Sequence, residues 1–227
     1  MSALVSVVIP TVAGREDHYA RCVAAYERTA GDRIEIITIR DRPTCGIAWN
    51  EGAAQATGDY IHFTADDLEP HDGWLEPALE AVHRGYLPAP RIIRREGGRD
   101  YCDYCGVHGR ELPDKVIVDM SVVPFMSRKQ WDDIGPSLDC HYFTDNWISW
   151  RGERAGYLTV VRRAFAFTHH WAQPRRGAGM TMPERMAHDR QVFEAAKRGD
   201  RRWVGERGPE LVRLPLGTQV RRAQAPS

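Results

Sequence analysis

Leu4-Val-Ser-Val-Val-Ile-Pro10 is a nearly continuous apolar run, which is typical of a strand buried in a parallel sheet. Apolar residues follow at helical spacing over residues 19–26, and β-branched residues predict a second strand at 34–39. A helix around residues 49–56 and a third strand at 59–64 continue the series. Short connections between alternating strands and helices indicate right-handed crossovers. The sequence therefore predicts an α/β fold with a Rossmann-like, mixed but mainly parallel sheet flanked by helices.

The second half of the chain is less regular. Helices are predicted at residues 72–84, 130–134, 144–155 and 183–198, and strands at residues 116–124 and 157–167. Residues 86–115 are rich in Gly, Pro, Arg and Asp, so a long loop is expected there. We expect a single domain over residues 1–203, with two halves that meet at about residue 85. Residues 204–227 are expected to form an irregular tail.

Composition narrows the class of protein. A chain of 227 residues with 42% hydrophobic and 27% charged residues is of ordinary globular type. It contains no apolar run near the roughly 20 residues that span a bilayer, and its N-terminus has no signal-peptide pattern, so we expect no membrane partner. Five cysteines in such a chain fit reduced thiols and a cytoplasmic location. The single pair Cys102 and Cys105, near His108, is expected to be free thiols rather than a zinc site.

Charge is distributed unevenly along the chain although the net charge is zero. Residues 1–150 contain 15 Lys and Arg against 24 Asp and Glu, whereas residues 151–227 contain 16 against 7. Such a basic region is consistent with a phosphate-bearing ligand. It is also consistent with basic surface residues that cluster late in the chain, and charge alone does not separate a nucleotide-sugar from a nucleic acid.

Two adjacent aspartates, Asp66 and Asp67, come directly after the third predicted strand. Open α/β sheets bind ligands beyond the carboxyl ends of their strands. Adjacent carboxylates repel each other unless a cation or hydrogen-bond donors compensate, which favours a hard divalent ion with oxygen ligands. An isolated Asp-Asp pair is otherwise a common feature of surface turns.

An ordered series of short motifs accompanies the acidic pair. It consists of Ile9-Pro10-Thr11 after the first strand, Asp41 after the second, and then Gly46, Asn50, Gly52 and Gly58-Asp59-Tyr60-Ile61. With this series, residues 4–76 resemble the donor half of family-two glycosyltransferases, which have the nucleotide-binding GT-A fold. The chain departs from the family pattern at Arg40, Trp49 and Ala65.

The resemblance implies a donor half over about residues 1–85, an acceptor half over about 86–203, and a role for each motif. Asp67 would bind Mn²⁺ or Mg²⁺ that bridges the donor diphosphate, and Asp66 would contact the ribose or the metal shell. Asp41 would accept a hydrogen bond from the base, which suits uracil or thymine. Pro10, Thr11 and Asn50 are the further candidates for contact with the nucleoside-diphosphate sugar.

A second segment, Tyr142-Phe-Thr-Asp145-Asn-Trp-Ile-Ser-Trp-Arg151 followed by Ala155-Gly156-Tyr157, is similar to the acceptor-side helix of the same family. In inverting transfer, a carboxylate takes the proton of the attacking hydroxyl. Asp145 is the candidate for this general base. The alternative is that Asp145 caps a helix that begins at Asn146.

Histidines and arginines follow the last predicted strand. In GT-A enzymes a histidine in this place commonly completes the metal site, so His170 and His169 are candidate ligands, with His170 preferred. Arg175 and Arg176 lie in a glycine-containing loop, where they would grip phosphate oxygens as part of a mobile lid. An ordinary exposed basic loop is the alternative.

These features predict a metal-dependent, inverting glycosyltransferase that uses a nucleoside-diphosphate sugar, with UDP as the expected nucleotide. Residues 205–217 resemble a segment of bacteriophage tail tape-measure proteins, which suggests a phage enzyme acting in the host cytoplasm. The expected acceptor is then a virion protein, with modified phage DNA bases as the alternative. A nucleotidyltransferase is a further alternative, and so is an inactive module that binds sugar or nucleic acid.

Overall fold

Two parallel crossovers build the first half of the chain. The computed structural model describes residues 4–96, 99–103, 113–170 and 181–199. The first elements are β1 (Val5–Thr11), α1 (Glu16–Ala30), the 3₁₀ turn η1 (Gly31–Arg33), β2 (Ile34–Arg40), α2 (Cys45–Gln55) and β3 (Tyr60–Phe63). β1 lies between β2 and β3 and is parallel to both. The alternation predicted for residues 4–64 is confirmed.

The second half adds a further sheet and four helices to the described residues. Its elements are β4 (Leu68–Pro70), α3 (Leu75–His83), β5 (Leu87–Glu96), β6 (Arg99–Asp103), β7 (Phe125–Ser127), α4 (Arg128–Ile134), α5 (Thr144–Arg154), β8 (Thr159–His169) and α6 (Met182–Gly199). The four predicted helices and the strand predicted at 157–167 are confirmed, with small shifts of their ends. None of the helices in the described ranges is long and apolar enough to cross a bilayer.

The loop predicted for residues 86–115 is wrong over its first part, where β5 and β6 form an antiparallel pair. β5 also pairs in parallel with β8. Its prolines suggested a loop, because proline lacks the N–H that a ladder needs. The structure accommodates Pro90 with a register irregularity between Ala89 and Arg91, so the ladder resumes beyond the proline.

The strand predicted for residues 116–124 is also wrong. Residues 115–118 share three backbone hydrogen bonds with β8 around an isolated bridge between Ile117 and Val160, and the strand β7 begins after Pro124. The backbone N–H of Ser121 donates to Ser149 Oγ at 3.1 Å, so a side chain takes the place of a neighbouring strand. Beyond residue 118, the β-branched residues of this segment therefore pack without a ladder.

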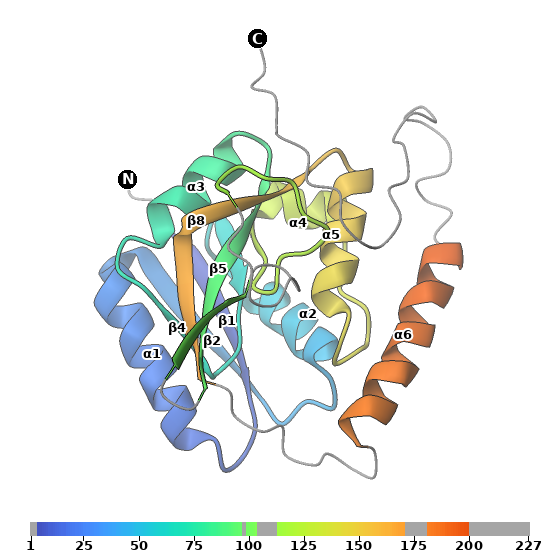
Figure 1. Cartoon of the computed structure of the whole chain (residues 1–227), viewed down its shortest axis with the longest axis horizontal. Helices are drawn as coiled ribbons and strands as arrows, with labels where there is room; N and C mark the ends of the chain where they lie inside the picture. Colours follow the sequence, from blue (N-terminus) through green and yellow to red (C-terminus); the bar gives the residue numbers. More distant parts are fainter. Residues whose placement is uncertain (1–3, 97–98, 104–112, 171–180, 200–227) are drawn as a thin grey trace.

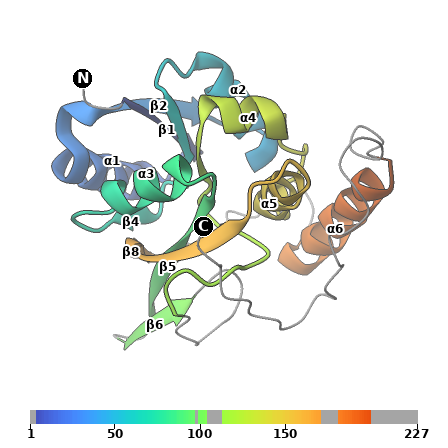
Figure 2. The same cartoon turned by 90° about the horizontal axis from the view of Figure 1, so that it is seen from above.

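The strands form two four-stranded sheets, with the orders β2-β1-β3-β7 and β4-β8-β5-β6. The first sheet is parallel except for β7, which is antiparallel to β3. In the second sheet only β5 and β8 are parallel. Figure 1 shows the arrangement, and Figure 2 shows α1 and α3 between the strands of the two sheets, with α2 and α4 on the opposite side of the first sheet.

An aromatic core fills the space between the two sheets. It includes Tyr26, Trp74, Phe165 and Phe167, all fully buried, and these rings surround His62. Tyr26 Oη lies 2.8 Å from His62 Nε2. Burial lowers the pKa of His62 to about 3, so the ring is neutral and serves as a hydrogen-bonded core residue. This core supports β3, at whose end the acidic pair lies.

The motif glycines have a packing role. A Cβ on Gly46 would lie 1.6 Å from the backbone oxygen of Leu138, and one on Gly52 would lie 2.2 Å from Val8 Cγ1. Neither neighbour has room to move, because one is backbone and the other is a fully buried strand residue. These glycines let α2 lie directly on β1 and on the segment that leads to α5. They therefore set how α2 packs between β1 and the segment before α5.

Candidate active site

The acidic pair lies in the short connection between β3 and β4. Asp66 and Asp67 are only 4% and 9% exposed. The backbone of this connection is held by Thr64 N–H, which donates to Val8 O at 3.1 Å, and by Leu68 N–H, which donates to Ala65 O at 3.3 Å. Two adjacent carboxylates thus face the inside of the molecule at the carboxyl end of a parallel strand, and their charge must be compensated.

Arg15 supplies that compensation. Its Nε lies 2.9 Å from both carboxylate oxygens of Asp66, and its Nη2 donates to Asp67 Oδ2 at 2.9 Å. Thr11 Oγ1 donates to Asp66 Oδ2 at 2.7 Å, so Asp66 is held from two directions. Removing one partner of such a buried ion pair typically costs about 3–5 kcal/mol. Sequence reasoning did not assign Arg15 to the site, because nothing in the local pattern joins residue 15 to residues 66 and 67.

Two histidines reach the acidic connection from the end of β8. His169 Nε2 lies 3.5 Å from Asp67 Oδ2, whereas His170 Nε2 lies 3.0 Å from Glu69 Oε1. The backbone N–H of His170 donates to Asp67 O at 2.8 Å. Successive side chains of an extended chain point to opposite sides, so the two rings diverge. The prediction from the sequence places His170 ahead of His169 as a metal ligand. In the structure, it is the His169 nitrogen that approaches the Asp67 carboxylate.

The charge state of Asp67 follows from these neighbours. Burial by itself would raise the pKa of Asp67, but the hydrogen bond and charge of His169 and the guanidinium of Arg15 outweigh it. The net effect lowers the pKa of Asp67 below its ordinary value. Asp67 is therefore an ionised, acceptor-only group near neutral pH.

A divalent cation fits this donor set with two ligands from the protein. Asp67 Oδ2 and His169 Nε2 are 3.5 Å apart, and a carboxylate with an imidazole is a donor pair that suits Mn²⁺. Within the described part of the chain, no group of three or more His, Cys, Asp or Glu side chains is arranged to hold a metal. The remaining positions would then belong to diphosphate oxygens and water, as usual for ions that bind with phosphates.

The other donor-side candidates lie around the end of β1. Asp41 has a positive φ of 54°. Its N–H donates to Thr11 O at 3.0 Å and its Oδ1 accepts from Ala13 N–H at 3.0 Å, which ties the end of β2 to the loop after β1. Pro10 lies within β1 opposite Ile39. Asn50 pairs through both ends of its amide with the backbone of Ser137, at 3.0 and 2.8 Å, so it links α2 to the segment before α5.

Asp145 lies in the first turn of α5. The helix begins at Thr144, and the residue before it, Phe143, is in the left-handed region with φ 67°. The alternative in which Asp145 caps a helix that starts at Asn146 is therefore wrong; instead Asp145 Oδ1 accepts from the N–H of Asn146 at 2.9 Å. Burial raises the pKa of Asp145 to about 6, although this N–H favours the ionised form. A carboxyl group with such a pKa can take and return a proton near neutral pH.

The start of α2 lies near Asp145. Burial raises the pKa of the Cys45 thiol, and the charge of Asp145 raises it further, which places Asp145 near the first residue of α2. Gly46 N–H donates to Cys140 O at 2.9 Å, and Thr44 Oγ1 donates to Asp139 Oδ1 at 2.6 Å. The start of α2 therefore holds the segment that leads into α5 from one side.

The last described helix, α6, holds the same segment from the other side. Its buried residues are Asp189 and Phe193. Asp189 Oδ2 accepts hydrogen bonds from the N–H groups of His141 and Tyr142 at 2.9 and 3.0 Å, and Phe193 stacks on Phe143 with ring centroids 5.6 Å apart.

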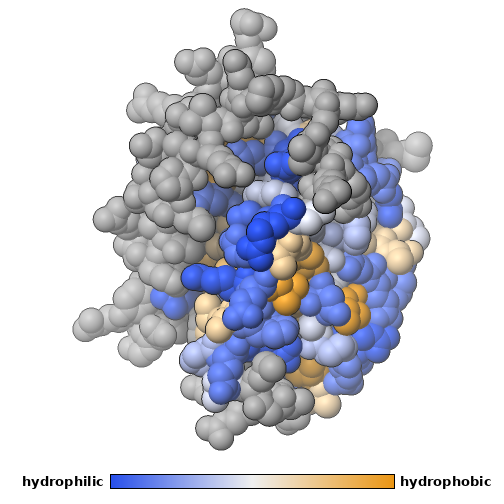
Figure 3. All heavy atoms as spheres, turned by 90° about the vertical axis from the view of Figure 1, so that its right-hand side faces the viewer, coloured by the Kyte–Doolittle hydropathy of each residue, from blue (hydrophilic) through white to orange (hydrophobic). Residues whose placement is uncertain are grey.

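Figures 1 and 2 show α6 at the edge of the molecule beside α5. The outer side of α6 is accessible, with Met182 and Met186 at 41% and 38% exposure, and Figure 3 shows that hydrophilic side chains predominate on this side of the molecule.

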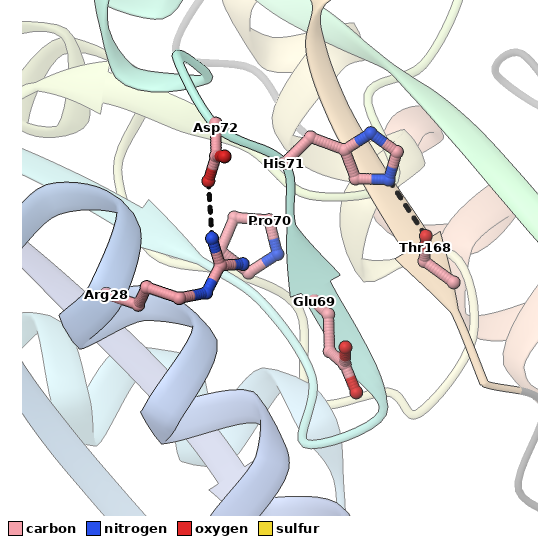
Figure 4. Close-up of a pocket in the computed structure, with 6 residues that line it drawn as sticks. All are labelled: Arg28, Glu69, Pro70, His71, Asp72 and Thr168. Carbon is pink, nitrogen blue, oxygen red and sulfur yellow. Dashed lines mark hydrogen bonds and ion pairs between the residues drawn. The ribbon is translucent and has the colours of Figure 1, made fainter.

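A hollow of about 340 Å³ lies near the outer end of β4. It is lined by Arg28, Glu69, Pro70, His71, Asp72 and Thr168. Figure 4 shows that most of its polar groups pair with one another: Arg28 with Asp72 at 2.5 Å, and His71 Nε2 with Thr168 Oγ1 at 2.8 Å. These paired groups do not converge on a common point, so the acidic pair remains the better candidate site.

Some sequence expectations fall outside the described residues. These are the basic lid with Arg175 and Arg176, the residues Cys105 and His108, and the tail at 204–227. Of the cysteines in the described ranges, Cys22, Cys45 and Cys140 are free thiols.

Comparison with known families bears on the part of the chain that holds the acidic pair. Residues 13–104 match the model of glycosyl transferase family 2, a range that contains Arg15, Asp41, Asn50 and the acidic pair. A comparison with curated proteins finds no match to the chain. The family match and the mixed sheet flanked by helices identify a GT-A fold, and they identify the chain as a glycosyltransferase. Glycosyl transfer is thereby favoured over nucleotidyl transfer and over an inactive binding module.

Proposed function

We propose that the protein transfers a sugar, with inversion, from a UDP-linked sugar to an acceptor hydroxyl, with Mn²⁺ or Mg²⁺ as cofactor. The observation that carries the proposal is the buried pair Asp66 and Asp67 at the end of β3, within the range that matches the family, with His169 3.5 Å from Asp67. An ionised carboxylate pair at the end of a parallel strand is suited to a cation and the diphosphate that accompanies it.

On the donor side, Asp67 and His169 would hold the divalent ion. When bound, the ion offsets the negative charge that develops on the departing diphosphate. Asp66, fixed by Thr11 and Arg15, would contact the ribose or a water of the metal shell. The exposed Asp41 would accept a hydrogen bond from the imide N–H of uracil, and Pro10 and Thr11 would border the nucleotide. Arg175 and Arg176 would contact phosphate oxygens of the donor.

On the acceptor side, Asp145 would act as the general base. The acceptor oxygen forms a bond to the anomeric carbon while its proton passes to the Asp145 carboxylate. The bond from the anomeric carbon to the diphosphate oxygen breaks, and UDP leaves with the electron pair. A single displacement of this kind inverts the anomeric configuration. The raised pKa of Asp145, about 6, is close to the range in which a base works best near neutral pH.

The acceptor that we propose is a macromolecule, with a phage virion protein ahead of a modified DNA base. The excess of basic residues after residue 150 and the resemblance of residues 205–217 to phage tail proteins support it. A base in duplex DNA would first have to leave the stack. Transfer of radiolabelled sugar to purified virion proteins and to phage DNA, at low and high salt, distinguishes the two, because binding to DNA phosphates weakens steeply with salt.

The donor and cofactor are tested first. A thermal-shift screen of nucleoside-diphosphate sugars, each with and without Mn²⁺, should show stabilisation by one UDP-sugar that requires the metal. Release of UDP and incorporation of the sugar are then measured with that donor, and the anomeric configuration of the product is determined by NMR. Retention of configuration, or equal stabilisation with and without metal, would contradict the proposed mechanism.

A further inference from the structure

We propose that Arg15 is a resident cation of the acidic pair, which a divalent metal has to displace from Asp67, so that binding of the metal and of the nucleoside diphosphate are coupled through this one side chain. This inference rests on the proposed function, because it concerns the same metal and donor. It goes further by assigning a role to a residue that lies outside the sequence motifs.

The contacts show why the two cations compete. Arg15 Nη2 lies 2.9 Å from Asp67 Oδ2, the same oxygen that lies 3.5 Å from His169 Nε2. A metal held between Asp67 Oδ2 and His169 Nε2 would compete with Arg15 for that oxygen. A guanidinium and a divalent ion repel each other, and the site is nearly closed to solvent, with Arg15 and Asp67 side chains 14% and 10% exposed. Solvent therefore screens this repulsion poorly.

The backbone that carries Arg15 is fixed, so the movement falls on the side chain. Arg15 N–H donates to Val12 O at 3.3 Å, and Gly14 N–H donates to Glu16 Oε1 at 2.8 Å. Ala13 N–H is bound to Asp41 Oδ1 at 3.0 Å. A guanidinium on a flexible stem at the start of α1 can turn away from Asp67 while this loop keeps its conformation.

The diphosphate provides the new partner for the displaced side chain. A guanidinium binds two phosphate oxygens in a fork, as it binds a carboxylate. The donor thus brings both the oxygens that complete the coordination of the metal and the anion that takes Arg15. Without a nucleotide, the guanidinium stays on the acidic pair, with Nη2 2.5 Å from Asp66 Oδ1 and 2.9 Å from Asp67 Oδ2, so the metal has to compete with it. Metal binding should then be weak in the free enzyme and strong with the nucleotide.

The test is direct titration of the full chain with Mn²⁺. Electron paramagnetic resonance measures the concentration of unbound ion at each step. Three proteins are compared: the unaltered chain, Arg15→Gln, and the matched control Arg28→Gln. Arg28, within α1, is likewise an arginine paired with an aspartate, but its side chain is 61% exposed and its partner is Asp72. Both variants change the net charge equally.

Without nucleotide, Arg15→Gln should bind Mn²⁺ at least about 5-fold more tightly than the unaltered chain, the lower range of typical coupling between sites. Arg28→Gln should bind it as the unaltered chain does. Calorimetric titration with UDP at saturating Mn²⁺ should show weaker UDP binding to Arg15→Gln. Arg15→Lys should also tighten Mn²⁺ binding, but by a smaller factor, since an ammonium keeps the positive charge and lacks the two-pronged hydrogen bonding of a guanidinium. This variant replaces Arg15→Gln in the test if Arg15→Gln does not fold.

Equal or weaker Mn²⁺ binding by both Arg15 variants would overturn the inference, and Arg15 would then be a structural partner of the acidic pair. Asp67→Asn separates this outcome from failure of the proposed function. If Asp67→Asn abolishes Mn²⁺ binding while the Arg15 variants leave it unchanged, the metal site stands and only the coupling fails. If none of the proteins binds Mn²⁺ with or without UDP, both proposals fail.

Discussion

The carboxylate of Asp189 in α6 accepts a hydrogen bond of 3.0 Å from the backbone N–H of Tyr142, three residues before Asp145. The same oxygen also accepts from His141 N–H at 2.9 Å. Asp189 is 1% exposed, and two backbone donors together with His188 lower its pKa although burial opposes this. A buried carboxylate on one helix thus fixes the turn that aims the candidate base on another.

Asp189→Asn should therefore reduce turnover without a matching loss of donor affinity. An amide oxygen is a weaker acceptor than a carboxylate, and hydrogen bonds to charged groups contribute about 1.5–3 kcal/mol each. We expect a drop in unfolding free energy of about 1–3 kcal/mol and a fall in kcat, measured by denaturant unfolding and steady-state kinetics. His188→Ala, which removes only the more exposed partner of Asp189, should have a clearly smaller effect. Equal effects of the two changes would count against this role of Asp189.

Asp67→Ala should abolish metal-dependent binding of the donor while the fold survives. Asp66 keeps its contacts with Thr11 and Arg15 in this variant, so the charge of the guanidinium remains paired. Calorimetric titration with UDP and Mn²⁺ measures the loss, and circular dichroism checks the fold. Asp72→Ala is the control, because Asp72 is 82% exposed and its ion pair in the described structure is with the exposed Arg28. Unchanged UDP affinity in Asp67→Ala would remove Asp67 from the site.

His169→Ala and His170→Ala form a matched pair of variants at the end of β8. His169 Nε2 approaches Asp67, whereas His170 Nε2 approaches Glu69. We expect His169→Ala to weaken Mn²⁺-dependent UDP binding by at least about 10-fold, the lower range for altering a metal site, and His170→Ala to weaken it less. The backbone contact of His170 with Asp67 is retained in both. A larger loss in His170→Ala would mean that the bound metal selects the other ring.

Asp145→Asn should lower kcat by roughly 100-fold or more, the scale of losing a general base, and leave UDP affinity near that of the unaltered enzyme. The same variant should unfold less readily at pH 8. At that pH the fold has to bury an ionised Asp145, whose pKa is raised to about 6, and a neutral amide avoids the cost. A gain of about 1–2 kcal/mol is expected.

Thermal and denaturant unfolding at pH 8 measure this gain, with the exposed Asp132→Asn as the control. If Asp145 only supported the fold, Asp145→Asn would lower the stability of the protein. Loss of stability together with parallel losses of kcat and donor affinity would therefore identify Asp145 as a support of α5 rather than as the base.

The dependence of rate on pH follows from the same carboxyl group. The base has to be ionised, so kcat/KM should rise with pH and level off above about pH 6, the pKa of Asp145 in the folded enzyme. The sign for stability is opposite. Since the folded pKa lies above the unfolded value, the contribution of Asp145 to stability is present at acid pH and is lost as the pH rises through about 6. Rates measured from pH 4.5 to 8.5 check the first statement, and an acid limb that persists in Asp145→Asn would assign it to another group.

Local sequence patterns determined the first half of this molecule. Each of its elements has a local pattern that matches the spacing at which a strand or a helix buries side chains. These patterns are the apolar run at residues 4–10, the helical spacing after it and the β-branched segments that follow. Crossover handedness then leaves few ways to assemble them. The place of Asp66 and Asp67 at the end of β3 follows directly, because residues that come after a parallel strand lie at the ligand-binding edge.

Tertiary structure alone decided the pairing of β5 with β8 and the partners of the acidic pair. Residues 15 and 66, or 142 and 189, are far apart in sequence, and no local period encodes which distant side chain compensates a buried charge. Arg15 reaches Asp66 because β1 and β3 are neighbours and their following loops meet. His169 rather than His170 faces Asp67 because the antiparallel register pairs Leu68 with His169, and a shift by one residue would exchange the two rings.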